Sequence, residues 1–349
     1  MATMTALAVA RHVKCGVDVR VDGLRNAAPA AFYMSTEAHS CARKAIELLG
    51  FGSASIRTIP TDGDYRMKVD ALESAIEDDR ARAVRPIAVV ATGGSTNTGA
   101  IDDLSAIAGV CRRHDVWMHV DAAYGGPAIL SAEYAGALRA IAQADSVALD
   151  PHKWLFVPVE AGLVLVRDAD AMRSTFSLVP PYIRQSDSAG EVYGLPWFSE
   201  YGFQQTRGFR ALKVWMTLQQ FGLSGYREVI EENLALAGYL VDRVRNAPDL
   251  ELAAPPSLSV VCFRFGGNRS GSHAGRSEET IAALNRALLE RLQLGGEAFL
   301  TSTELRGRFV LRACIVNYRS RREDVDRMLG AVVEIGRDLL KSEDFSASL

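Results

Sequence analysis

A lysine that follows a strand-like run is the residue of this sequence that most directly suggests chemistry. Residues 145–154 read DSVALDPHKW, so the apolar run 146–149 ends immediately before Asp150, His152 and Lys153. An amine that is partly removed from water beside other cationic groups is held less firmly in its charged form and can act as a nucleophile. Its strongest use is an imine with an aldehyde cofactor, although most lysines are only solvated surface charges.

A carboxylate stands at a matching position in an earlier segment. Residues 116–120 are typical of a buried strand, and Asp121 follows at its end, where ligands bind in open α/β sheets. The small Ala122 and Ala123 would let a flat ring lie close to the backbone. A carboxylate and an imine-forming lysine on neighbouring strand ends are what pyridoxal phosphate requires. Capping of the next helix by Asp121 is the alternative, and the residues alone leave the two interpretations balanced.

Three further polar side chains follow predicted strands. Ser95 belongs to the Gly/Ser/Thr-rich turn 92–99, which could donate amides and hydroxyls to an anion but is not a Walker loop. The imidazole of His39 could stack on a cofactor ring, and His152 could bind a phosphate. For Ser95 the alternative is an ordinary strand-to-helix turn. For His39 it is a packed or capping histidine, and for His152 a histidine that only packs the turn.

Two other groups carry candidate chemistry. Tyr182 begins a long polar segment, and a phenol on a mobile loop can protonate a carbanion once the loop closes; an exposed loop aromatic is the alternative. Arg207 and Arg210 begin a predicted helix and could pair with a phosphate or carboxylate, although solvated charges are the default. We expect no metal site, because the remaining histidines lack ligand spacing: His12, His114, His119 and His273.

The composition is that of a soluble globular protein. The chain has 349 residues, 48% hydrophobic and 23% charged, and a net charge of −3 without a basic block, which argues against nucleic acid and anionic membrane partners. No apolar run is long enough to span a bilayer, and the N-terminal apolar stretch lacks the basic region of a signal peptide and fits a buried helix. Five scattered cysteines predict a reducing, cytoplasmic compartment without disulfides.

Strand-like and helix-like segments alternate from residue 30 to about 167, which predicts an α/β fold with a largely parallel sheet between helices. Ser35 or Thr36 is expected to cap the first helix of this region, and Asp102 or Asp103 the helix 104–113. We predict a large domain over 1–220, with a mobile loop at about 180–206, and a small C-terminal α+β domain over 221–349. The predicted strands are 31–34, 54–59, 86–90, 116–120, 146–149 and 162–166.

Taken together, these segments resemble the pyridoxal-phosphate-dependent amino-acid decarboxylases, the group with the aromatic-L-amino-acid, histidine and glutamate decarboxylases. The resemblance covers nearly the whole chain in the family's order. It implies a fold-type-I transferase-like architecture with a mostly parallel sheet of the seven-stranded type. The matching segments are STEAHS (35–40), ATGGSTNTGAIDDL (91–104), WMHVDAAYGG (117–126), DPHKW (150–154), PPY (180–182) and RGFRALKVW (207–215).

The resemblance also implies a reaction, the decarboxylation of an L-amino acid, with aromatic substrates favoured. Lys153 would form the Schiff base with pyridoxal 5'-phosphate, Asp121 would keep the ring nitrogen protonated, and Tyr182 would protonate the carbanion after carbon dioxide leaves. In similar enzymes the loop with this tyrosine reaches the neighbouring subunit, so a homodimer is implied. An aldehyde synthase, an aminotransferase and a non-catalytic remnant are the alternatives.

The other site residues would surround the cofactor. By the same resemblance, His39 and Ala123 would lie against opposite faces of the ring. Ser95 would bond near its substituents, and Asp150 and His152 would lie near the phosphate. Asp150 stands where family members often have Asn. Family members also have an N-terminal segment that ends in a phosphate-binding turn, and this sequence is expected to begin just after that turn.

Overall fold

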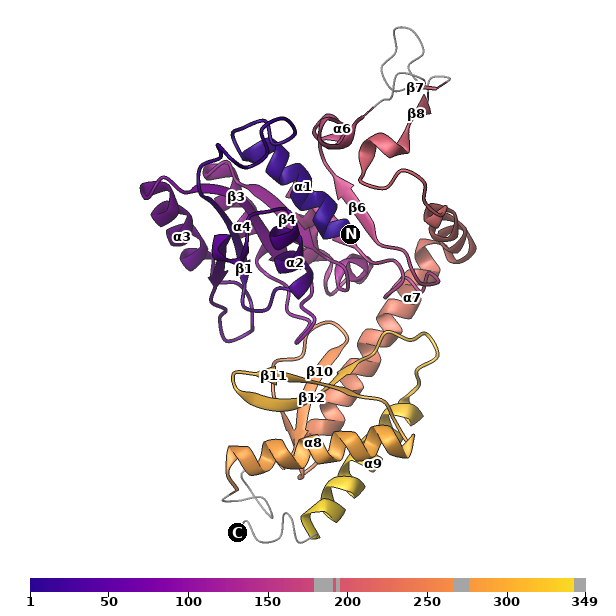
Figure 1. Ribbon diagram of the computed structural model, residues 1–349. Coiled ribbons are helices and arrows are strands. Elements are labelled where there is room, and N and C mark those ends of the chain that lie inside the picture. Colours follow the sequence, from indigo (N-terminus) through magenta and orange to yellow (C-terminus); the bar gives the residue numbers. More distant parts are fainter. Residues whose placement is uncertain (179–190, 193–194, 267–275, 342–349) are drawn as a thin grey trace. The chain divides into compact units, whose positions relative to one another are not determined.

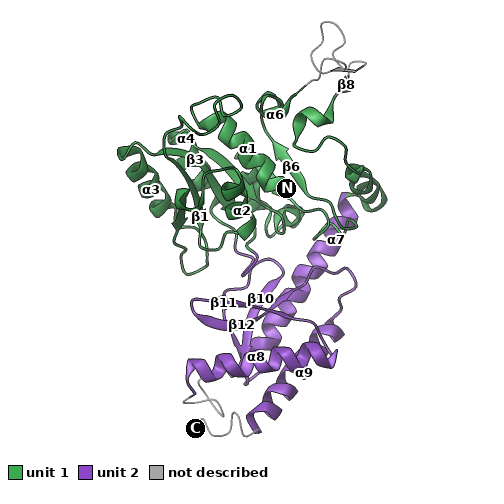
Figure 2. Ribbon diagram, viewed as in Figure 1, with its two compact units in different colours: residues 1–95, 101–222 green, residues 96–100, 223–349 purple. Residues whose placement is uncertain are grey.

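A computed structural model describes residues 1–178, 191–192, 195–266 and 276–341. The chain forms two compact units, each described here by itself (Figure 2). The first comprises Met1–Ser95 and Ile101–Gly222, and the second comprises Thr96–Ala100 and Leu223–Leu349. The main transition between the units therefore falls at Gly222, and a short piece of the Gly/Ser/Thr-rich turn belongs to the second unit.

The first unit is built on a sheet whose strand order is β2-β1-β3-β4-β5-β6 (Figure 1). The pairs from β2 to β5 are parallel and β6 is antiparallel to β5. All six strands lie at or within a few residues of the predicted segments, but the described sheet has six strands where the family resemblance implied seven. The strands are β1 (Ala30–Ser35), β2 (Ile56–Ile59), β3 (Arg85–Thr92), β4 (Trp117–Asp121), β5 (Ser146–Leu149) and β6 (Leu163–Val166).

Helices flank this sheet, and α1 is the buried N-terminal helix that the sequence predicts. Its side chains Leu7 and Val9 are fully buried in a cluster with Phe32 of β1 and Ile46 of α2. This apolar burial anchors α1 and α2 to the sheet. The helices of this unit before the long helix α7 are α1 (Ala2–Lys14), α2 (Ser40–Leu48), α3 (Val69–Ala81), α4 (Leu104–Arg113), α5 (Ala135–Leu138) and α6 (Ala169–Phe176).

Two helix starts test the predicted caps. Asp103 caps α4 as predicted, since its Oδ1 accepts a hydrogen bond from the Ala106 amide at 3.0 Å. The predicted cap of α2 is wrong: Ser35 ends β1, and the helix begins after His39, whose Nδ1 accepts the Cys41 amide at 3.3 Å. A neutral imidazole nitrogen can accept such a bond, although hydroxyl and carboxylate side chains are the usual caps.

The segment after α6 differs from the predicted pattern. Residues 179–190 and 193–194 are outside the described part, but β7 (Glu191–Val192) pairs with β8 (Leu195–Pro196) within the predicted long loop. The helix predicted to begin at Arg207 and a second helix after it are both present, and they meet at Gly222 within the element α7 (Arg210–Asn246). Gly222 has φ 62° and ψ 174°, which a residue with a Cβ rarely adopts, so glycine permits the kink there.

The second unit is the small α+β domain expected at the C-terminus. Its antiparallel sheet has the order β11-β12-β10-β9, and α7, α8 (Glu278–Gly295) and α9 (Arg322–Lys341) pack against it. Phe263 and Phe265 are fully buried in its core. Within the described residues, none of the helices combines the length and apolarity of a membrane span. The strands are β9 (Leu250–Leu252), β10 (Val260–Phe265), β11 (Thr301–Leu305) and β12 (Arg308–Cys314).

Asp102 holds the end of β3 in place from a buried position. Its Oδ1 accepts the Met67 amide at 2.7 Å and its Oδ2 accepts the Thr92 amide at 2.8 Å. Burial raises the pKa of Asp102 to about 6, and the two amide hydrogen bonds oppose that shift only in part. The folded chain therefore holds the Asp102 proton more tightly than an unfolded chain, in which the pKa is near 3.8.

We expect Asp102 to make the free energy of unfolding decrease as the pH rises through this range. A raised native pKa contributes stability that is complete below about pH 4 and lost as the pH passes about 6. Relative to Asp102→Asn, which does not titrate, the wild type should lose about 2 kcal/mol between pH 4.5 and pH 7. Urea unfolding at the two pH values measures this difference.

Asp103→Asn is the matched control, because Asp103 is exposed and asparagine also caps helices. Its stability relative to the wild type should change little between the same two pH values. An equal pH dependence for the two variants would contradict the assignment to Asp102.

Candidate functional site

The carboxyl ends of β3, β4 and β5 meet in the first unit. Asp121 at the end of β4 is in register with Thr92 of β3 and with Ala148 of β5. Residues that follow these three strands therefore lie at one edge of the sheet, the edge at which open α/β sheets bind ligands. The two residues with which the sequence argument began, Asp121 and Lys153, follow neighbouring strands there.

Asp121 is a partly buried carboxylate with fixed orientation. Its Oδ1 accepts a hydrogen bond from the Ala123 amide at 3.1 Å, and the Cys41 thiol donates weakly to its Oδ2 at 3.9 Å. The Ala123 amide belongs to a turn, so Asp121 closes that turn rather than capping an α-helix. One oxygen is thus tied to the backbone, and the other faces the start of α2.

Lys153 lies in the turn that follows β5. Its Nζ is 2.9 Å from Asp150 Oδ2, and 41% of its side chain is exposed. The family resemblance implies that Asp150 lies near the cofactor phosphate; in the described chain its carboxylate pairs with the Lys153 amine. Because Lys153 and Asp121 both influence the titration of the Cys41 thiol, the amine lies within electrostatic reach of the same cluster.

The residues after β4 are small because the turn that they form packs closely against the end of β5. A Cβ on Gly126 would lie 2.3 Å from Leu149 Cδ2 and 3.1 Å from Ala122 Cβ, so the turn after β4 approaches the end of β5 closely. Trp154 is fully buried and stacks on Tyr124, with ring centroids 5.1 Å apart and planes at 7°. The turn that carries Lys153 is therefore anchored next to the turn that follows Asp121.

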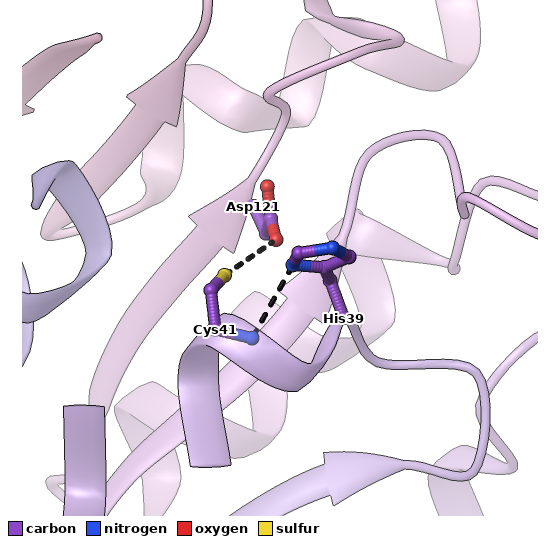
Figure 3. A group of neighbouring side chains, drawn as sticks. All are labelled: His39, Cys41 and Asp121. Carbon is purple, nitrogen blue, oxygen red and sulfur yellow. Dashed lines mark hydrogen bonds between the residues drawn. The ribbon is translucent and has the colours of Figure 1, made fainter. Parts of the chain in front are cut away.

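His39, Cys41 and Asp121 form a cluster that Figure 3 shows at the start of α2. Their side chains come from the loop before α2, from its first turn and from the end of β4. His39 is exposed, which leaves its ring accessible for stacking. Burial, and next the charge of Asp121, raise the pKa of the Cys41 thiol, so the thiol stays protonated near neutral pH. Sequence reasoning did not identify Cys41, because its partner is distant in the chain.

A second group missed by sequence reasoning lies behind Asp121, with Trp117 and His119 on β4 and Ser146 on the neighbouring β5. The Ser146 hydroxyl accepts the Trp117 indole N–H at 2.8 Å and lies 2.9 Å from His119 Nδ1. His119 is completely buried, and its Nε2 has no hydrogen-bond partner within the described residues. Burial lowers the pKa of His119, so the imidazole is neutral near pH 7.

The other predicted residues are placed as follows. Ser95 is buried at the end of the first unit's part of the Gly/Ser/Thr-rich turn. His152 Nδ1 is 2.8 Å from the Ala161 carbonyl oxygen and 3.2 Å from the Ala161 amide, so it holds the turn. Arg210 pairs with the Glu160 carboxylate at 2.6 Å. Tyr182 is outside the described residues.

Comparison with known proteins identifies the group to which this geometry belongs. The family model described as the pyridoxal-dependent decarboxylase conserved domain matches residues 2–266. The chain belongs to this family. The family, the fold class and the pyridoxal cofactor expected from the sequence are thereby confirmed.

Individual relatives cover most of this chain but only part of their own length. An aromatic-L-amino-acid decarboxylase of Bacillus atrophaeus is 36% identical over 97% of this chain and 68% of that protein. An L-2,4-diaminobutyrate decarboxylase of Rhizobium meliloti is 36% identical over 96% of this chain and 64% of that protein. The Oryza sativa protein TDC, solved with PLP and tryptamine, has a TM-score of 0.89 and 30% identity over 97% of this chain and 69% of that one. The chain thus spans about two thirds of these relatives.

The residues of the site fit a pyridoxal group. A half-exposed lysine amine suits the aldehyde, and a carboxylate held by a backbone amide suits a protonated ring nitrogen on the neighbouring strand end. Ala122 and Ala123 have small side chains and the His39 imidazole is exposed, which suits a flat ring beside the backbone. When bound, the group would be held by Lys153 and Asp121 and would supply an electron-withdrawing ring.

We expect Ser146→Ala to reduce the free energy of unfolding by about 2 to 5 kcal/mol. The substitution leaves the Trp117 N–H and the His119 Nδ1 buried without their shared partner, and each orphaned group costs about 1–3 kcal/mol. Denaturant unfolding monitored by Trp fluorescence measures the loss. Ser53→Ala, at an exposed serine, should change the value by less than about 0.5 kcal/mol. A loss below about 1 kcal/mol for Ser146→Ala would show that the hydroxyl is not needed.

Proposed function

We propose that this chain binds pyridoxal 5'-phosphate through Lys153 and removes the carboxylate of an L-amino acid as carbon dioxide. The observation that carries the proposal is the position of Asp121 at the end of β4 and of Lys153 in the turn after the neighbouring β5, in a chain of the pyridoxal-dependent decarboxylase family. The bound cofactor supplies an electron sink that accepts the electron pair of the broken Cα–carboxylate bond. A proton then takes the place of the carboxylate, and the product is the amine.

Lys153 and Asp121 have separate tasks in this proposal. Lys153 would separate from Asp150, lose a proton and hold the cofactor covalently through Nζ, with the aldehyde oxygen leaving as water. Asp121 keeps a proton on the ring nitrogen, and the Ala123 amide keeps the carboxylate turned correctly for that contact. Both residues thereby position the group before the substrate arrives.

The remaining candidate residues orient the ring and complete the reaction. We assign His39 to one ring face and Ala123 to the other, Ser95 to the ring substituents, and Asp150 with His152 to the phosphate side. Tyr182 is the proposed proton donor to the substrate carbon after carbon dioxide leaves. Retention of the proton donor favours the amine as product over the aldehyde of an oxidative enzyme.

Aromatic amino acids are the proposed substrates. Relatives named for aromatic substrates include the Bacillus atrophaeus decarboxylase, at 36% identity, and an Oryza sativa tryptophan decarboxylase, at 35% identity over 84% of this chain. The similarly related diaminobutyrate decarboxylase, and a mouse acidic amino acid decarboxylase at 31% identity, define the competing classes. Carbon dioxide release from tryptophan, tyrosine, glutamate and 2,4-diaminobutyrate, measured in parallel, separates the three classes.

We expect Lys153→Ala to abolish the covalent link to the cofactor and to reduce carbon dioxide release by at least about 10³-fold. The wild type with saturating pyridoxal phosphate should gain a visible absorption band. Borohydride should then fix one cofactor per chain on Lys153, which peptide mass spectrometry locates. Lys68→Ala, at an exposed lysine of the same unit, is the control. It should retain both the visible absorption band and the carbon dioxide release.

Three results would contradict parts of this proposal. A colourless wild type would exclude the enzyme and favour the non-catalytic alternative. Label on a lysine other than Lys153 would reject the site. Aldehyde with oxygen uptake, or transfer of the amino group to a keto acid, would replace decarboxylation by the aldehyde-synthase or aminotransferase reaction.

We also propose a homodimer in the cytoplasm. None of the five cysteines, all of which belong to the described residues, forms a disulfide, which suits a reducing compartment. The first part of α7 and the residue before it carry large apolar side chains that are 42–75% exposed, more than an isolated soluble surface usually leaves bare: Phe209, Leu212, Trp215, Met216 and Phe221. A second copy of the chain is the partner that we assign to this surface.

Trp215→Glu should shift the protein from dimer to monomer, because a buried unpaired charge at an interface costs several kcal/mol. Light scattering after size exclusion, at several protein concentrations, measures the mass. Ser74→Glu adds the same charge at an exposed polar position of another helix, α3, and should leave the mass unchanged. A monomeric wild type would refute the dimer, and a dimeric Trp215→Glu variant would exclude this surface.

A further inference from the structure

Three side chains of different chemistry converge beside the cofactor site. His39, Cys41 and Asp121 each offer one ligand atom, a nitrogen, a sulfur and an oxygen, and these atoms all lie within 4.8 Å of one another (Figure 3). These residues form no metal-binding motif along the chain, because Asp121 comes from β4 while the other two flank the start of α2.

The set is chemically matched to Zn²⁺. Thiolate, imidazole and carboxylate are the usual zinc ligands, and three protein ligands with a water molecule make an open tetrahedral site. Zinc–ligand bonds of about 2.0–2.3 Å place neighbouring ligand atoms about 3.5 Å apart. Cys41 Sγ and Asp121 Oδ2 are already 3.9 Å apart. His39 is exposed, so its ring can make the remaining adjustment without disturbing the core.

The polar surroundings suit a cation and its water. In the described chain the thiol proton lies between Cys41 Sγ and the Asp121 carboxylate, the position that a cation would take. Thr92 is in register with Asp121 on the adjacent strand, so its side chain lies on the same face of the sheet. The Thr92 hydroxyl is buried and has no hydrogen-bond partner within the described residues. A metal-bound water molecule would give it one.

We propose that His39, Cys41 and Asp121 bind Zn²⁺ in the cofactor-free chain, and that Zn²⁺ and pyridoxal phosphate exclude one another. Binding replaces the thiol proton: Cys41 S–H and Zn²⁺ give a zinc–thiolate bond and a proton released to solvent. Exclusion follows because zinc takes the Asp121 oxygen that would face the ring nitrogen and draws His39 away from the ring. The exclusion rests on the proposed function, whereas metal binding by itself does not.

Titration of the cofactor-free protein with Co²⁺, a coloured substitute for Zn²⁺, tests the metal site. We expect one equivalent to produce a sulfur-to-cobalt charge-transfer band in the near ultraviolet and tetrahedral visible bands, and Zn²⁺ to displace it. Cys41→Ser should remove the charge-transfer band and weaken Zn²⁺ binding at least tenfold by calorimetry. Asp121→Asn should weaken it similarly. Cys314→Ser, at a partly exposed cysteine of the second unit, should leave both unchanged.

Competition completes the test and keeps the two proposals separable. Saturating pyridoxal phosphate should weaken Co²⁺ binding at least tenfold in the wild type. A charge-transfer band that survives in Cys41→Ser, or no band in the wild type, overturns the metal site even if the cofactor colours the protein. A cobalt site that depends on Cys41 but ignores a bound cofactor overturns the exclusion. Failure of the cofactor to bind, with the cobalt titration intact, overturns the proposed function alone.

Discussion

The parallel pairing of β4 between β3 and β5 is the constraint on which the site depends. Its register aligns Asp121 with Thr92 and Ala148 at the carboxyl edge of the sheet. A slip of one residue would turn Asp121 to the opposite face and bury a different set of side chains. Such a slip is opposed because Val120 and the strands beside it are buried on both faces.

The apolar core transmits this constraint to residues outside the sheet. Leu7 of α1 and Ile46 of α2 pack with Phe32 of β1, so α2 cannot move independently of the strands. The start of α2, with His39 and Cys41, is thereby held beside the end of β4. On the other side, the stacked and buried Trp154 holds the turn with Lys153. Two separate hydrophobic contacts thus hold the start of α2 and the turn with Lys153 at the edge of the sheet where Asp121 lies.

The charged side chains of the site already have partners, and a cofactor would have to replace those partners when it binds. In the described chain Lys153 is paired with Asp150, and Asp121 takes the Ala123 amide and the Cys41 thiol. These contacts satisfy the groups that a cofactor would otherwise engage. The same Asp121 oxygen suits a protonated ring nitrogen or a cation, since both present positive charge to it. A pyridine ring and a cation would therefore compete for the same carboxylate, that of Asp121.

The sequence by itself determined the strand segments, the buried α1 and the positions of Asp121 and Lys153 at strand ends, because hydrophobic runs and the residues that end them are local signals. The resemblance of six segments to the decarboxylase family added the prediction that the cofactor is pyridoxal phosphate. Only the tertiary structure showed the His39 cap of α2, the pairing of Asp150 with Lys153, the contact of Cys41 with Asp121 and the kink at Gly222 between the two helices of α7. These features depend on which elements pack together and in which register, and residues distant along the chain carry no local pattern that reveals their contact.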